Sequence, residues 1–187
     1  MGIMVPDNFN NLADELEKQE LDAPGGVPPP QVYAKLLAIY LYRNDLCNAK
    51  YLWKRIPLTS KSSYPELNLI WGVGKAMWQR DLPTVYSTIQ NTPWSENVCN
   101  IMKALHEEVQ KRATELVSRA YSSLSVDTLS ALVGLRQEDA LKLAAERGWQ
   151  VDNGLVIPTR PVISTPPIAS SEDQLYKLTD FVSFLEN

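Results

Sequence analysis

The chain has 187 residues, 44% of them apolar and 21% charged, which is enough material for a sizeable core of ordinary globular composition. Its net charge of −4 and pI near 5.1 lack the basic excess with which a sequence-independent nucleic-acid binder displaces counterions. No apolar stretch approaches the length of about 18 residues that a membrane span needs, so neither nucleic acid nor membrane is expected as a partner. Cys47 and Cys99 are predicted to be reduced core thiols of an intracellular protein.

Residues 1–30 are predicted to form a short helix followed by a loop. The helix has apolar residues at near-helical spacing among several acids: Phe9, Leu12, Leu16 and Leu21. The prolines and glycines of the segment 23–30 cannot sustain a helix, so the next helix is expected to begin near Pro29 or Pro30.

A helical hairpin recurs within residues 31–121. In its first copy two apolar stripes are interrupted at Asn44 and Asp45, which predicts two antiparallel helices joined by a tight turn. When the sequence is shifted by 36 residues, from 43 to 79, segment 43–46 falls on segment 79–82 and Pro57 falls on Pro93. A period in the mid-thirties is typical of TPR-like helical repeats, in which each hairpin needs a neighbour to cover its apolar face.

A long amphipathic segment, 95–121, is expected to cap the two repeats, with Ser95 as its N-cap and Glu96 in its first turn. The apolar residues predicted for its buried side are Val98, Ile101, Met102, Leu105, Val109, Ala113, Leu116, Val117 and Ala120.

Residues 122–158 are predicted to form a winged-helix subdomain. Two short helices, 126–132 and 137–147, are separated by Gly134, which suits a helix C-terminus with a positive φ angle. Two short strands then flank Asn153 and Gly154, a dipeptide that favours a tight hairpin turn. The predicted fold is therefore mainly α, with helical repeats, a winged helix with a small β-hairpin, and a final helix.

A winged helix raises the alternative of a nucleic-acid-binding protein, because such motifs place the start of the second helix at base edges. Here that start is Gln137, Glu138 and Asp139, whose two carboxylates would repel phosphates. Only Lys142 and Arg147 lie further along the helix to compensate. A winged helix that binds protein is therefore the preferred interpretation.

The chain is predicted to end in a proline-containing linker, 159–171, and an assembly helix, 172–187. The linker would let the helix reach another chain, although docking onto this chain's own core stays possible. The apolar face of the helix is the predicted protein interface, made by Leu175, Leu178, Phe181, Val182 and Leu185.

No catalytic, cofactor-binding or metal-binding residue is predicted. His106 is the single histidine, which is too few for a zinc hydrolase and leaves a Ser-His or Cys-His pair without support. Gly72 and Gly74 lack the context of a nucleotide loop. The tryptophans of the repeats are predicted to be core residues, and a basic patch around Tyr51 and Trp53 leaves RNA binding as a minor alternative: Lys50, Lys54, Arg55 and Lys61.

Helical repeats followed by a winged helix resemble the PCI domain, which the proteasome lid, the signalosome and a translation initiation factor share. The resemblance extends from about Tyr33 to Ile157. Several longer segments are similar to the signalosome members of this family: 21–26, 51–57, 78–81, 94–96 and 178–187.

This resemblance implies a noncatalytic subunit of a nuclear and cytoplasmic complex that removes the modifier Nedd8 from cullins and so regulates cullin-RING ubiquitin ligases. The isopeptidase site would lie in another subunit. In the family, winged helices pack edge to edge and C-terminal helices gather in a bundle. The resemblance therefore implies that the strands around Val151 and Val156 offer hydrogen-bonding edges to other signalosome subunits.

Overall fold

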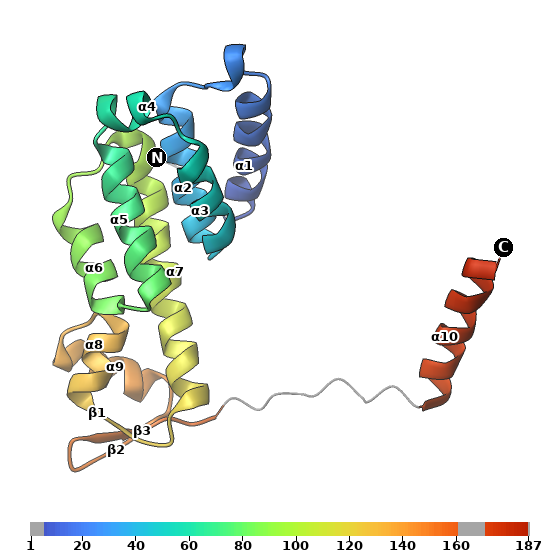
Figure 1. Cartoon of the computed structure of the whole chain (residues 1–187). Helices are drawn as coiled ribbons and strands as arrows, with labels where there is room; N and C mark the ends of the chain where they lie inside the picture. The colour runs from blue at the N-terminus through green and yellow to red at the C-terminus, as the bar shows by residue number, and fades with distance from the viewer. Residues whose placement is uncertain (1–5, 161–170, 187) are drawn as a thin grey trace.

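The computed structural model describes residues 6–160 and 171–186 and shows a mainly helical chain with a small sheet at one end (Figure 1). The predicted linker falls largely on residues 161–170, which lie outside the described residues. The elements in chain order are α1 (Pro6–Leu21), the 3-10 helix η1 (Pro24–Gly26), α2 (Pro30–Tyr42), α3 (Leu46–Arg55), α4 (Leu58–Ser63), α5 (Glu66–Gln79), α6 (Leu82–Asn91), α7 (Glu96–Ala120), β1 (Leu124–Ser125), α8 (Val126–Val133), α9 (Gln137–Glu146), β2 (Gln150–Asp152), β3 (Leu155–Ile157) and α10 (Ser171–Glu186).

The two predicted hairpins are α2–α3 and α5–α6, and their turns repeat in atomic detail. Asn44 and Arg80 take equivalent left-handed conformations, with φ of 60° and 59°. The following residues, Asp45 and Asp81, donate their amide N–H to carbonyls five residues back, over 2.8 and 3.0 Å. Each aspartate then caps the next helix by accepting an N–H bond three residues on. The predicted repeat is therefore confirmed.

Helix α1 packs on the first hairpin through apolar and polar contacts. The Phe9 ring lies 5.1 Å from that of Tyr42, and Arg55 pairs with Glu20 at 2.6 Å. The Tyr40 hydroxyl donates a 2.8 Å hydrogen bond to Glu17. Burial, and to a lesser extent the Glu17 carboxylate, raises the pKa of Tyr40 to about 12. The first 30 residues thus contribute to the same core as the repeats.

Helix α7 connects two apolar cores. Its first half packs against the hairpins, and Val109 is its last residue in the larger core. Val117 belongs to the smaller core, which α8, α9 and the sheet complete. Ser95 stands at the predicted N-cap position, but its hydroxyl donates to Glu66 at 2.9 Å and caps nothing. The Glu66 carboxylate also accepts the Ser95 N–H at 2.8 Å and so ties α7 to α5.

The junction between the repeats and the smaller core is close and specific. Tyr86 of α6 is buried and donates its hydroxyl to the Leu132 carbonyl of α8 at 3.1 Å, and burial raises its pKa to about 12. Gly134 follows α8 with φ of 69°, as predicted, and lies against the Tyr86 ring. Gln110 of α7 adds a 3.1 Å bond to the Val133 carbonyl.

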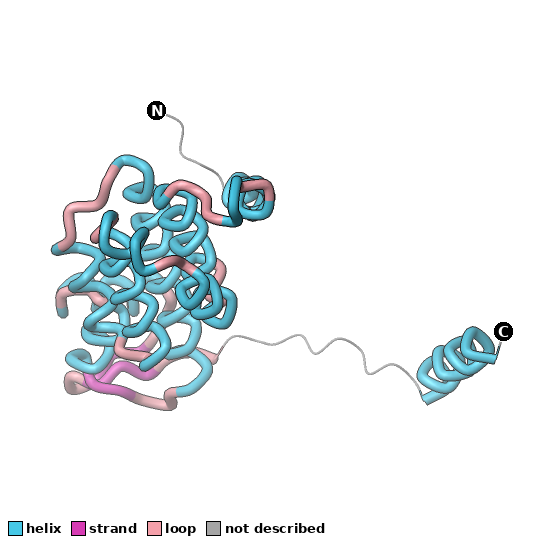
Figure 2. Tube along the Cα trace, turned by 45° about the horizontal axis from the view of Figure 1, so that its top comes forward, coloured by secondary structure: helices cyan, strands magenta, loops and turns pink. Residues whose placement is uncertain are grey.

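Residues 124–157 have the element order predicted for a winged helix, with one strand that the sequence did not predict. The three strands lie in the order β1-β3-β2, and all neighbours are antiparallel. Asn153 and Gly154 both have positive φ, 47° and 79°, which fits the expected tight turn. Figure 2 shows the strands together at one end of the helical body and α10 standing clear of it.

Several residues predicted to be in the core are exposed. Cys47 is exposed on α3 and Cys99 is half-buried, and both are free thiols. Trp78 of α5 is 51% exposed, and Leu116 of α7 is 55% exposed and belongs to neither core. Leu21 and Ala120, the last residues of α1 and α7, are also exposed since packing partners end before them.

Candidate assembly surfaces

Helix α10 is the most exposed apolar element of the described chain. Every side chain that the structure describes for it, from 175 to 185, is exposed. The predicted interface residues range from 52% exposed at Val182 to 79% at Leu185, and they recur at helical spacing: Leu175, Leu178, Phe181, Val182 and Leu185. Such a contiguous apolar surface is typical of an element that another surface covers.

Phe184 widens this apolar face beyond the five predicted residues. It is 78% exposed and follows Phe181 by three positions, so the two rings are neighbours on the helix surface. A wide apolar face suits a helix that contacts more than one neighbour in a bundle. The sequence indicates this wide face through the run from Phe181 to Leu185, in which one residue of five is polar.

The sheet has two outer strands, the two-residue β1 and the three-residue β2, and Val151 lies on β2. Val151 is 47% exposed. Val156 lies on the central strand β3, opposite Leu124 on one side and Val151 on the other, and is fully buried. The expectation that Val156 offers an edge is therefore wrong, because β1 takes the side of β3 that the predicted two-stranded hairpin would leave open.

The outer face of the sheet carries two further apolar side chains. Leu155 and Ile157 are 47% and 40% exposed, and they flank the buried Val156. Because side chains alternate across a strand, a core residue at 156 places 155 and 157 on the opposite face. This alternation could have identified them from the sequence as surface residues.

Helix α9 has acidic residues in its first turn, where a DNA-binding helix-turn-helix has hydrogen-bond donors to the bases and phosphates. Glu138 is exposed at the start of α9, and Gln137 donates to the Asp127 carboxylate. Lys142 is already paired with Asp139 at 3.0 Å, which leaves less positive charge to meet a phosphate. The electrostatics of α9 thus favour a protein partner.

His106 makes packing contacts. Its Nε2 lies 3.2 Å from the Gln90 amide nitrogen, and its ring stands edge-on to Tyr86 at 5.3 Å. It lines one shallow pocket of about 420 Å³ together with Cys99. Within residues 6–160 and 171–186, no group of three or more His, Cys, Asp or Glu side chains could hold a metal ion. No helix in this part of the chain is long and apolar enough to cross a membrane.

Stacked helical hairpins followed by two short helices and a three-stranded antiparallel sheet define a class of mainly helical, PCI-like protein. A family model described as the CSN8/PSMD8/EIF3K family matches residues 29–167. The chain belongs to this family.

Full-length relatives agree with the family match. The chain is 50% identical over 182 residues to COP9 signalosome complex subunit 8 of Xenopus laevis, covering 96% of this chain and 93% of the relative. It is 44% identical over 189 residues to the protein of the same name from Danio rerio, covering 99% and 98%. The identity to that of Arabidopsis thaliana is 32% over 158 residues, covering 83% and 79%.

Proposed function

We propose that this chain is a noncatalytic, structural subunit of a COP9 signalosome complex. The observation that carries the proposal is helix α10, whose apolar side chains are all exposed in the isolated chain. Burying one Leu or Phe side chain contributes about 1.5–3 kcal/mol, so five such residues can supply a strong anchor. Relatives that carry the name of a signalosome subunit identify the complex in which this anchor would act.

Two contacts would hold the subunit in place. Helix α10 inserts its apolar face into a bundle made with helices of other subunits, in the helix-in-groove manner. The open edge of β2 at Val151 adds a second contact by pairing with a neighbouring winged helix. The repeats between α1 and α7 then form a rigid arm, since both hairpins and α1 share one core.

At the level of the complex, the proposed role is to support removal of Nedd8 from cullins, and thereby the regulation of cullin-RING ligases, in nucleus and cytoplasm. The isopeptidase chemistry would belong to another subunit. What supports this division is the environment of His106, the one imidazole of the chain, which contacts Gln90 and Tyr86.

The test is to replace Leu178 and Phe181 by Asp and to measure how much of the tagged chain co-purifies with the other subunits. Carboxylates in a bundle core cost burial energy and add a desolvation penalty. We expect the affinity for the other subunits to fall by about hundredfold, the equivalent of roughly 2.8 kcal/mol, and the co-purified amount to fall with it.

A matched control adds two carboxylates to the other side of the helix, as Tyr176→Asp with Ser183→Asp. At 100° per residue these positions face away from Leu178 and Leu185. This variant should co-purify like the unmodified chain. Undiminished co-purification of the Leu178 and Phe181 variant would disprove the anchor.

A further inference from the structure

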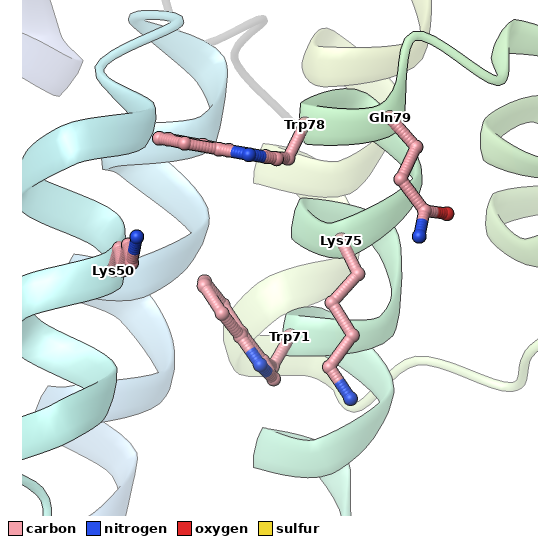
Figure 3. A pocket seen from close by; sticks show the side chains of 5 residues that line it. All are labelled: Lys50, Trp71, Lys75, Trp78 and Gln79. Carbon is pink, nitrogen blue, oxygen red and sulfur yellow. The ribbon is translucent and has the colours of Figure 1, made fainter.

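A groove between α3 and α5 is lined by tryptophans and lysines. It encloses a pocket of about 140 Å³ bounded by Lys50 of α3 and by Trp71, Lys75, Trp78 and Gln79 of α5. In Figure 3 both indole rings extend from α5 towards α3, where Lys50 faces the space between them. The groove therefore combines aromatic walls with positive charge at its rim.

The first repeat shows what a filled version of this position is like. Tyr42 is equivalent to Trp78 under the 36-residue shift, and Phe9 of α1 packs against its ring at 5.1 Å. In the second repeat a lysine contacts the equivalent aromatic ring. The Nζ atom of Lys50 lies 4.7 Å from the centre of the Trp78 ring. Trp78 is left 51% exposed, so the apolar contact that completes the first position is missing from the second.

The positive charge at the groove is not neutralised within the described chain. Lys50 and Lys75 form no ion pair in residues 6–160 or 171–186, although the whole chain carries a net charge of −4. The acids nearest in sequence to Lys50 and Trp78 are Asp45 and Asp81, and both are used in capping, where each accepts one backbone and one side-chain hydrogen bond. The groove is thus a positive site on an acidic protein.

The indole rings around the groove are in contact with lysine side chains and with one another. Trp53 and Trp71 stack with ring centres 5.4 Å apart and planes within 10°, and the Lys61 ammonium lies 4.5 Å from the Trp53 ring. Trp53 already contacts Trp71 and the Lys61 ammonium, so the groove offers Trp71 and Trp78, with Lys50 and Lys75 beside them, and not the row of rings on which successive bases stack. Carboxylates can bind these lysines without displacing them.

We infer that the groove binds an acidic peptide segment of a partner protein. An aromatic or large aliphatic side chain of the segment would enter the pocket against Trp71 and Trp78, and flanking carboxylates would pair with Lys50 and Lys75. Tryptophan is one of the residues most enriched in binding hot spots. The inference is independent of the proposed function, since it uses no residue of α10 or the sheet.

The experiment measures fluorescence anisotropy of a short fluorescein-labelled peptide, a Leu-Phe pair flanked by glutamates, titrated with the full chain at low salt. A peptide with glutamine in place of every glutamate serves as the charge control. We expect the acidic peptide to bind at least about tenfold more tightly, and its affinity to fall as salt is raised.

Variants of the chain locate the site. Lys50→Glu with Lys75→Glu should weaken binding of the acidic peptide by about tenfold or more, whereas Lys103→Glu with Lys111→Glu, on the exposed side of α7, should change it less than about twofold. Lys50→Phe, which recreates the aromatic pair of the first repeat, should abolish binding while the melting temperature stays at or above that of the original chain.

Three results would overturn the inference. These are the absence of acidic-peptide binding, equal loss of affinity in the α7 control variant, and tighter binding of a labelled single-stranded oligonucleotide that the Lys50 and Lys75 variant abolishes. The last result would assign the groove to nucleic acid.

Discussion

At Gly134 one hydrogen atom in place of a side chain allows α6 and α8 to meet. The residue has φ of 69°, and a Cβ atom there would lie 2.3 to 2.7 Å from atoms of the Tyr86 ring. The ring is itself held by its hydroxyl bond to Leu132 and cannot easily withdraw. We expect Gly134→Ala to lower the free energy of unfolding by about 2–4 kcal/mol, through overpacking added to the left-handed penalty.

Gly148 provides the matched control for this substitution. It has φ of 68°, but a Cβ there would meet no atom within 4 Å, so Gly148→Ala should cost only the backbone penalty of about 1–2 kcal/mol. Urea unfolding followed by circular dichroism measures both variants. Equal losses at the two glycines would show that the Tyr86 contact contributes nothing.

Single residues also show what the sequence could and could not predict. The positive φ of Gly134 followed from its place between two helical patterns, whereas its partner Tyr86 lies 48 positions earlier (134 − 86) and left no local signal. Val156 was predicted correctly as a strand residue, but its burial depends on β1, which pairs from across α8 and α9. Trp78 has a core-like spacing, and only the arrangement of α3 and α5 shows that it is half exposed.

At the scale of elements, the two hairpin turns predict equal dependence on their capping aspartates. Asp45 and Asp81 each accept a backbone N–H three residues on, at 3.0 and 3.3 Å, and each accepts a second bond from a side chain. Replacing either by Ala should lower stability by about 1 kcal/mol, the usual value of an N-cap.

Thermal unfolding of the two single variants provides the measurement. Asp14→Ala is the control, because Asp14 is an exposed residue inside α1 where alanine is the better helix former. The control should be neutral or slightly stabilising. If Asp81→Ala left the melting temperature unchanged while Asp45→Ala lowered it, the two hairpin turns would not be equivalent.

Elements with a strong period were predictable and short ones were not. The start of α2, the two hairpin turns and the extent of α7 followed from apolar spacing, turn residues and prolines, whereas the start of α5 was not predicted. Helix α4 has six residues and β1 has two, too few for any periodicity to appear. Ser95 was expected to cap α7 from its position alone, but tertiary contact with Glu66 takes its hydroxyl.

At the scale of the whole molecule, the helical body and α10 differ in how far their apolar side chains are buried. The body has two cores joined through α7, whereas α10 exposes all of its described side chains. A 16-residue helix whose apolar face is exposed is marginal in water, because most helix stability in proteins comes from packing. The amphipathic pattern was visible in the sequence, but a sequence pattern does not specify which surface covers it.

Hydrogen exchange of the α10 amides, measured by mass spectrometry on the free chain and on the purified complex, tests the central claim most directly. Amides of 171–186 should exchange at nearly the unfolded rate in the free chain and be slowed by at least about a hundredfold in the complex. Amides of α2, buried in the larger core, should be protected equally in both. Protection of α10 already in the free chain, or none in the complex, would contradict its role as the anchor to other subunits.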